Sequence, residues 1–309
     1  MHTLKMRLLH ILFDRYMRWR LAEFVLPQYP VILDYPIKPR PRYGDERPPH
    51  PELAAWLAGF DEIHRETLDR LLAFREPLSR IGEQPVPGKP GQPYWGNAYF
   101  TGFDAIALYG FLGLLKPARL IEIGSGNSTR FARRAISDLG LRTQITSIDP
   151  HPRAEIDDLC ERVFRIALED MDLDLFAELE AGDVLFIDNS HRVFQNSDVT
   201  VLFLEILPRL RPGVTVHVHD IFFPGDYPVE WMNRHYSEQY MLAAYILGGG
   251  ARLQSLLPVV HLGSSGELSH SIETGWTEDV FQRAFALNRR VTGGHIGTSM
   301  WLRTVCAPN

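Results

Sequence analysis

From about residue 102 onward, short apolar runs alternate with longer stretches in which apolar residues recur at helical spacing. The apolar runs predict β-strands over residues 119–123, 144–148, 163–167, 183–187 and 214–218. The stretches around them predict helices over residues 102–115, 128–139, 153–160, 172–180 and 197–207. Short apolar strands separated by helices are typical of βαβ units, in which helices cover both faces of a parallel sheet. We therefore expect an α/β domain.

The C-terminal part continues with different spacing. It predicts a helix over residues 238–247, a strand over 252–258, a helix over 277–288 and a final strand over 298–305. The domain is thus expected to end on a helix–strand–helix–strand sequence.

The N-terminal part has no such alternation. Eight prolines between Pro27 and Pro51 predict an extended arm, because proline fixes φ and lacks an N–H donor. Apolar residues at helical spacing over residues 52–72 predict one amphipathic helix, and a stretch rich in proline and glycine over 85–96 follows it. We expect a helical and proline-rich extension over residues 1–93 and the main domain over 94–309.

The first 26 residues mix leucines with basic side chains. Asp14 and Arg15 interrupt the apolar stretch, which argues against a signal peptide. Two interpretations stay open. The segment is either a basic amphipathic helix on a membrane surface, or a helix that docks on the body of the protein or on a second copy in a homodimer.

Composition narrows the class of protein. A net charge of −6 and a pI near 6.1 argue against a nucleic-acid-binding surface, which is normally basic. The two cysteines, Cys160 and Cys306, form no CxxC pair, so a disulfide framework is not expected and a reducing, cytoplasmic location fits. No run approaches 18 apolar residues, so we expect no membrane span.

A glycine loop follows the first predicted strand. The strand runs into Gly124 and Gly126, and a helix follows with Asn127 or Ser128 as its N-cap. A dinucleotide fingerprint would have a third glycine where this chain has Thr129. The loop by itself also fits a plain strand-to-helix turn.

The next strand makes the loop more informative. It ends at Asp149, 25 residues after Gly124. A carboxylate at the end of the second strand can accept hydrogen bonds from both ribose hydroxyls. Together the loop and Asp149 predict a cofactor that contains adenosine.

Four segments, residues 122–128, Asp149, 167–170 and 185–188, resemble the successive motifs of class I S-adenosylmethionine-dependent methyltransferases. The resemblance covers residues 94–305 and implies a Rossmann-like, mostly parallel seven-stranded sheet with a reversed last strand. It implies that Glu122 and the glycine loop hold the methionine part of the cofactor, that Asp149 holds the ribose and that the Glu169–Asp170 loop reaches the adenine. The cofactor-binding set expected from it is Glu122, Gly124, Ser125, Gly126, Asn127, Ser128, Asp149, Glu169, Asp170 and Asp188.

A second polar cluster follows the fourth and fifth predicted strands. Asp188 and His191 end the first of these segments, and His219 and Asp220 end the second, with His217 one pleat deeper. Ligands of an open parallel sheet bind outside the carboxyl ends of its strands, so we expect these side chains to meet beside the glycine loop. The alternative is that the acids only cap helices and the histidines are ordinary hydrogen-bonded groups.

The second cluster also resembles metal-dependent O-methyltransferases of the catechol and macrolide-sugar types. The resemblance implies that Asp188, His219 and Asp220 bind Mg²⁺ or another divalent cation, although histidine is a softer ligand than magnesium usually takes. It also implies a hydroxylated small-molecule substrate, such as a sugar or another natural product.

Methyl transfer to a hydroxyl needs a proton acceptor. His191 is the expected base, and His219 is either a second catalytic residue or a metal ligand. The aromatic loop over residues 223–231 is expected to be a substrate wall or a packed surface loop. Two other functions stay open: an NAD-dependent oxidoreductase on a similar sheet, and a metal-binding protein of this fold that transfers no methyl group.

Overall fold

The computed structural model describes residues 12, 37, 39–44, 46–249 and 252–306. The chain divides into two units, Met1–Pro39 and Arg40–Asn309, and the fold below is that of the second unit. Apart from Leu12, the basic amphipathic segment over residues 1–26 lies outside the described residues. No described helix is long and apolar enough to cross a membrane.

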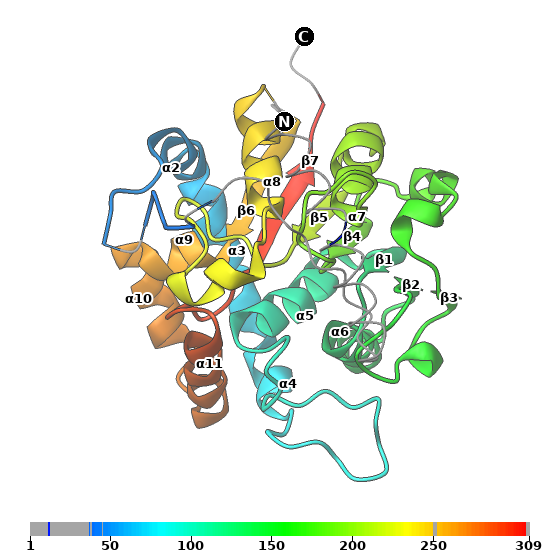
Figure 1. The fold of residues 1–309 in the computed structure, drawn as a ribbon. Helices are drawn as coiled ribbons and strands as arrows, with labels where there is room; N and C mark the ends of the chain where they lie inside the picture. The colour runs from blue at the N-terminus through cyan, green and yellow to red at the C-terminus, as the bar shows by residue number, and fades with distance from the viewer. Residues whose placement is uncertain (1–11, 13–36, 38, 45, 250–251, 307–309) are drawn as a thin grey trace. The chain divides into compact units, whose positions relative to one another are not determined.

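A seven-stranded sheet forms the centre of this unit (Figure 1). Its order is β3-β2-β1-β4-β5-β7-β6, and β7 runs antiparallel to both of its neighbours. This confirms the expected mostly parallel sheet with a reversed last strand. The strands are β1 (Arg119–Ile123), β2 (Gln144–Ile148), β3 (Arg162–Phe164), β4 (Val184–Ile187), β5 (Thr215–Val218), β6 (Leu253–Pro258) and β7 (Met300–Thr304).

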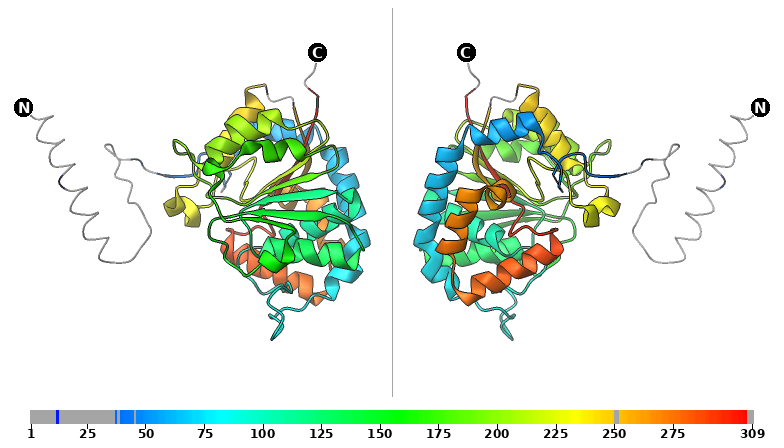
Figure 2. Two further views of the ribbon diagram at one scale, coloured as in Figure 1. Left: turned by 90° about the vertical axis from the view of Figure 1, so that its right-hand side faces the viewer. Right: turned by 90° about the vertical axis from the view of Figure 1, so that its left-hand side faces the viewer.

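Helices cover both faces of the sheet, giving three layers (Figure 2). Successive strand residues point to opposite faces, so Leu120 joins one core and Ile121 the other. Against the face of Leu120 pack α3 (Asp61–Leu71), α4 (Arg75–Ser79), α5 (Phe103–Leu115), α6 (Asn127–Asp138), α9 (Val259–Ser264), α10 (Gly266–Gly275) and α11 (Asp279–Val291). Against the face of Ile121 pack α2 (Pro51–Ala58), α7 (Asp198–Val201) and α8 (Glu238–Leu247).

Several helix predictions need correction. The helix expected over residues 52–72 is two helices, because α2 ends at Ala58 with Gly59 as its C-cap and α3 begins at Asp61. Residues 153–160 and 172–180 form only 3-10 turns, over Asp157–Leu159 and Leu173–Glu178. Segments this short have little helical stability of their own, so local packing decides their form.

The prediction for residues 197–207 was too regular, and three further helices, α4, α9 and α10, were not predicted. After α7 the chain continues as a π-helical turn over Leu202–Ile206 and a 3-10 turn over Leu207–Arg209. Helices α9 and α10 follow β6 directly and were missed. Their sequence is rich in serine and glycine, which weakens the apolar periodicity on which the prediction depends.

The helices before residue 94 belong to the packed body. Leu57 of α2 is fully buried in one core, and Leu71 of α3 is fully buried in the other. Upstream of α2, the Asp226 carboxylate accepts hydrogen bonds from the backbone N–H groups of Arg42 (2.5 Å) and Tyr43 (3.0 Å). Arg42 and Tyr43 of the proline-rich arm therefore pack on the loop that follows β5.

Candidate active site

The glycine loop turns the chain sharply between β1 and α6. Gly124 has φ of +78°, and a Cβ there would lie 1.8 Å from the backbone carbonyl oxygen of Asp188. No other residue fits this position, because both the backbone conformation and the space exclude a side chain. Gly124 thus brings β1 and the end of β4 into close contact.

Glu122 holds this loop in place through side-chain hydrogen bonds. Its buried carboxylate accepts hydrogen bonds from the hydroxyls of Ser128 and Thr129, both at 2.5 Å. Burial raises the pKa of Glu122 to about 7, while the two hydroxyl bonds act in the opposite direction. Thr129 also accepts from the N–H of Gly126 at 3.0 Å, so this residue anchors the loop where a dinucleotide fingerprint has glycine.

Asp149 lies where β2 ends, beside the glycine loop. Its carboxylate accepts from the backbone N–H of Ser125 and from that of His151, each at 2.8 Å. Each carboxylate oxygen has a second lone pair, so the group can also accept from a ligand hydroxyl.

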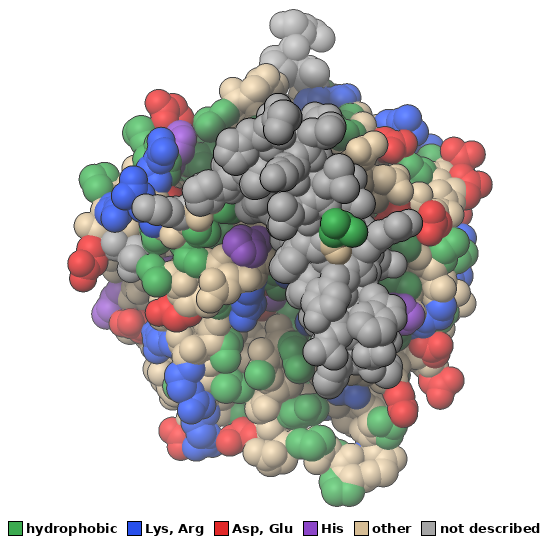
Figure 3. Space-filling view, viewed as in Figure 1, with side chains coloured by type: hydrophobic (Ala, Val, Ile, Leu, Met, Phe, Trp, Pro, Cys, Tyr) green, Lys and Arg blue, Asp and Glu red, His purple; other side chains and the backbone are tan. Residues whose placement is uncertain are grey.

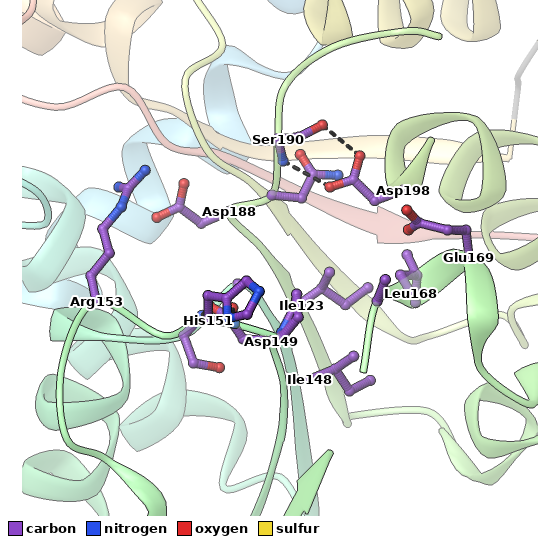
Figure 4. A pocket seen from close by; sticks show the side chains of 15 residues that line it. Ile123, Ile148, Asp149, His151, Arg153, Leu168, Glu169, Asp188, Ser190 and Asp198 are labelled. Carbon is purple, nitrogen blue, oxygen red and sulfur yellow. Dashed lines mark hydrogen bonds between the residues drawn. The ribbon is translucent and has the colours of Figure 1, made fainter. Parts of the chain in front are cut away.

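A pocket of about 270 Å³ opens over these residues (Figure 4). In Figure 4, Arg153 and Asp188 lie toward one end, Glu169 and Leu168 toward the other, and Asp149 between them. Of the predicted cofactor set, the residues that line it are Gly124, Ser125, Asp149, Glu169 and Asp188. Those that do not line it are Glu122, Gly126, Asn127, Ser128 and Asp170.

A second cavity of about 320 Å³ lies on the other side of Asp188 and Arg153, which line both. His191, His219 and Asp220 line this second cavity. The ends of β4 and β5 thus bring together the four polar residues that the sequence predicted to meet. The remaining lining residues include Tyr99, Trp231, Arg234, Tyr236, Asn288 and Thr298.

His191 is enclosed by three carboxylates. Its Nε2 lies 3.2 Å from Asp188 Oδ1 and 3.4 Å from Asp220 Oδ2, and its Nδ1 lies 2.8 Å from Glu238 Oε2. Burial by itself lowers the pKa of His191, but its bonds to Asp188 and Glu238 dominate and raise it well above the usual value. The imidazole is therefore held as a cation at neutral pH.

His219 is paired in the same way. Its Nδ1 lies 3.2 Å from Asp220 Oδ1 and 3.6 Å from Asp188 Oδ1, and its Nε2 lies 3.4 Å from Asp104 Oδ2. Although burial opposes it, the charges of Asp220 and Asp188 raise the pKa of His219 well above the usual value. Burial alone would raise the pKa values of Asp188 and Asp220. The nearby His219 and His191 outweigh this and lower both values.

The backbone at this cluster is also unusual. His191 has φ of 60° and Asp220 φ of 58°, the left-handed region that costs a non-glycine residue free energy. Such conformations persist at sites where the surroundings fix a side-chain direction. Here they accompany the pairing of the His191 imidazole with the Asp220 carboxylate.

His217 lies one pleat deeper, as expected, but outside the cavity. Its ring stacks on Phe186 with centroids 3.9 Å apart, and its Nε2 lies 2.8 Å from the Ser299 hydroxyl. Burial, followed by the charge of His219, lowers its pKa well below the usual value. His217 is therefore a neutral residue of the core.

The cation expected at Asp188, His219 and Asp220 stays a prediction. A metal ion needs donor atoms that converge on one point. Here the imidazole of His219 faces the carboxylates of Asp188 and Asp220, and the imidazole of His191 faces the same two carboxylates. In the described part of the chain, a group of metal-ligand atoms that all lie within 4.8 Å of one another occurs instead on α3 and α9. These residues therefore fit an ion-paired cluster better than a cation site.

The aromatic loop after β5 is packed against the body, and its Trp231 lines the second cavity. Phe222, Tyr227 and Trp231 are buried together with Val260, and the indole N–H of Trp231 donates to the carbonyl of Val291 at 2.8 Å. The Arg234 guanidinium lies 3.7 Å from the centre of a Trp231 ring. This packing fixes the position of Trp231.

Among the residues that the sequence did not predict, three are charged groups that pair with the two histidines or line both cavities. Glu238 and Asp104 pair with His191 and His219, and Arg153 lines both cavities. Asp104 carried a signal: it is an acid within an otherwise apolar helical segment, which needs a buried partner. Glu238 and Arg153 lie in polar segments and had no such signal.

Residues 121–221 match a family described as a methyltransferase domain. The O-methyltransferase from Bacillus cereus in complex with SAH is 14% identical, with a TM-score of 0.38, and the alignment covers 82% of this chain and 100% of that one. The plantazolicin methyltransferase BpumL in complex with SAH is 14% identical, with a TM-score of 0.39 and coverage of 80% and 98%. The SAH-bound Podospora anserina methyltransferase PaMTH1 is 15% identical, with a TM-score of 0.37 and coverage of 70% and 95%. No curated protein matches the sequence.

The family match falls on the segment that carries β1, the glycine loop, Asp149, β4 and β5. Together with the strand order, it confirms the Rossmann-like fold and the resemblance to class I S-adenosylmethionine-dependent methyltransferases.

Proposed function

We propose that this protein transfers a methyl group from S-adenosylmethionine to a hydroxyl of a small molecule, such as a sugar or another natural product. One observation carries the proposal: the pocket over Gly124 and Asp149 and the cavity around His191 share Asp188 and Arg153. Methyl transfer is an in-line displacement, so donor and acceptor sites must adjoin.

The first pocket would hold the cofactor. Asp149 would accept the ribose hydroxyls, and Glu169, which lines the pocket where Asp170 does not, would reach the adenine. The loop from Gly124 to Ser128 would hold the methionine part, with Glu122 fixing the loop from inside. Asp188 at the junction favours a cationic sulfonium over a neutral group, because opposite charges attract.

The second cavity would hold the acceptor. As the acceptor oxygen bonds to the methyl carbon and the carbon–sulfur bond breaks, the hydroxyl proton would pass to Nε2 of His191. Glu238 orients the ring by accepting from Nδ1, as an acid orients the base in many proton-transfer sites. Because His191 is held as a cation, it acts as a base only after it has lost its own proton, so the rate would rise with pH.

The wall of the cavity supports a small, polar acceptor. Tyr99, Trp231 and Tyr236 offer flat apolar faces, while Asn288 and Thr298 offer hydrogen bonds. Flat aromatic faces with a few polar groups are typical of sites for small molecules.

Two alternatives are separable from this proposal. An NAD-dependent oxidoreductase is disfavoured because Thr129 anchors the loop where the dinucleotide fingerprint has glycine.

If Asp188, His219 and Asp220 bind a divalent cation as the resemblance implies, chelation would abolish turnover and leave cofactor affinity intact. A protein that only binds metal would show no affinity for the cofactor.

Calorimetric titration of the full chain with S-adenosylhomocysteine and with NAD tests the proposal. We expect micromolar affinity for the first, about −8 kcal/mol, and none for the second. Asp149→Ala should weaken binding by roughly 1–3 kcal/mol because charge-assisted hydrogen bonds are lost. Asp170→Ala, just outside the pocket, is the matched control. Equal affinity in wild type and Asp149→Ala would refute the ribose assignment, and binding of NAD alone would refute the proposed function.

A further inference from the structure

Three side chains of the types that bind metal ions, Asp61, His64 and His261, lie together away from the active site. Asp61 and His64 are on the first turn of α3, and His261 is on α9, just after β6. Helix α3 packs along β6 (Figure 1), which brings residues about 200 positions apart in the chain together. None of the three lines either cavity of the active site.

The three donor atoms converge on Asp61. Its Oδ1 lies 3.6 Å from His64 Nδ1 and 3.7 Å from His261 Nε2, and all three atoms lie within 4.8 Å of one another. These separations are too long for hydrogen bonds. In a tetrahedral site with bonds of 2.0–2.1 Å, donor atoms lie about 3.3 Å apart, and both distances from Asp61 Oδ1 exceed this by only a few tenths of an ångström.

Two of these atoms are buried without a partner. His64 is fully buried, and neither its Nδ1 nor Asp61 Oδ1 makes a hydrogen bond. The other ring nitrogen, His64 Nε2, lies 2.8 Å from the Ser255 hydroxyl. If Nε2 donates to Ser255, the Nδ1 lone pair points at a carboxylate oxygen, and two buried acceptors face each other. A cation between them would satisfy both.

We propose that Asp61, His64 and His261 bind one divalent transition-metal ion, for which zinc is the best fit. Two imidazoles and one carboxylate are a donor set that zinc takes at 2.0–2.2 Å. Ser255 orients His64 as an outer hydrogen-bond partner of a metal-bound histidine. The fourth position is open to water, because the side chains of Asp61 and His261 are 47% and 17% exposed.

The ion would clamp α3 to the end of β6. Val260, next to His261, belongs to the buried aromatic cluster with Phe222 and Trp231, and Trp231 lines the second cavity. The metal would therefore stabilise the packing behind Trp231 without contacting a substrate.

Zinc content and affinity of the untagged full-length protein test this proposal. After equilibration with zinc and dialysis, we expect about one ion per chain, and cobalt in its place should give the visible absorption of a tetrahedral site. Ser255→Ala should weaken zinc binding about 10–100-fold, and Asp61→Asn or His261→Gln by on the order of 100-fold or more. His270→Ala, an exposed histidine on α10, and Asp188→Asn in the active site are the matched controls and should keep the ion.

Circular dichroism should show that the exposed-side variants Asp61→Asn and His261→Gln fold, and zinc should raise the melting temperature of wild type but not of these variants. Wild type that binds neither zinc nor cobalt would overturn the proposal. So would zinc that stays in both variants or leaves with Asp188→Asn, because the ion would then lie elsewhere.

Discussion

Gly124 and Gly126 occupy the same loop but leave very different room for a side chain. A Cβ on Gly124 would collide with the backbone of Asp188 at φ of +78°, whereas a Cβ on Gly126 would meet nothing within 4 Å. We expect Gly124→Ala to lower the free energy of unfolding by on the order of 3–5 kcal/mol, and Gly126→Ala by less than about 1 kcal/mol.

Urea denaturation of the two variants measures this difference. Equal stability of the two variants would mean that the close contact between Gly124 and Asp188 is wrong.

The buried carboxyl group of Glu122 makes stability depend on pH. Its pKa is about 7 in the folded protein against 4.5 for an ordinary glutamate, so between these values the folded state keeps a proton that the unfolded state has lost. The contribution is therefore complete below pH 4.5, falls as the pH rises to 7 and is flat above it.

Glu122→Gln has no such proton. Between pH 5 and pH 8, we expect the wild-type free energy of unfolding to fall by about 2–3 kcal/mol more than that of the variant. Urea denaturation at both pH values checks this, and other titrating groups cancel in the comparison. Parallel profiles would show that Glu122 is ionised in the folded protein.

His191 owes its raised pKa partly to Glu238. Glu238→Gln can still accept from Nδ1 but has no charge, so the pKa of His191 should fall by on the order of 1–2 units. NMR titration of ring-labelled histidines measures this without a known substrate. Glu205→Gln, at an exposed position after α7, is the control. An unchanged His191 pKa in Glu238→Gln would remove Glu238 from the proton-holding cluster.

At the scale of elements, the strands could be predicted closely. The bounds of β1 and β2 agree residue by residue, because continuous apolar runs are typical of strands buried on both faces. The turns at Asp157–Leu159 and Leu173–Glu178 could not be predicted as such, because their form depends on packing against the rest of the chain.

In the site too, some contacts could be predicted from the sequence and others depend on packing between distant segments. The meeting of Asp188 with Asp220 follows from strand ends that share one edge of a parallel sheet. The pairing of His191 with Glu238 does not, because 47 positions and an aromatic loop separate the two residues. The cluster at Asp61 depends likewise on how α3 packs against β6, which no periodicity indicates.

At the scale of the whole molecule, residues 40–50 are hydrogen-bonded to the loop after β5, whose Trp231 forms part of the wall of the second cavity. Besides the bonds from Asp226 to Arg42 and Tyr43, the N–H of His50 donates to the carbonyl of Pro224 at 2.9 Å. Two truncations isolate this contribution. A chain lacking residues 1–50 should melt at a lower temperature than one lacking 1–39, because only the former loses these bonds.

Differential scanning calorimetry of both truncated chains measures the comparison, and Asp226→Ala in the longer one should lower its melting temperature in the same direction. Identical melting of the two truncated chains would make residues 40–50 dispensable for the wall.

The described surface carries charges of both signs. On the face in Figure 3, acidic and basic side chains of the described residues are interspersed rather than gathered by sign. A surface of mixed charge favours solubility over binding to a polyanion. The chemistry is therefore expected inside the two adjoining cavities.

The crystal structure of the complex with S-adenosylhomocysteine tests the central claim most directly. We predict the ribose on Asp149, the adenine toward Glu169 and the sulfur toward Asp188, so that the missing methyl group would point into the cavity of His191. A ligand bound elsewhere, or one whose sulfur faces away from Asp188, would contradict the account.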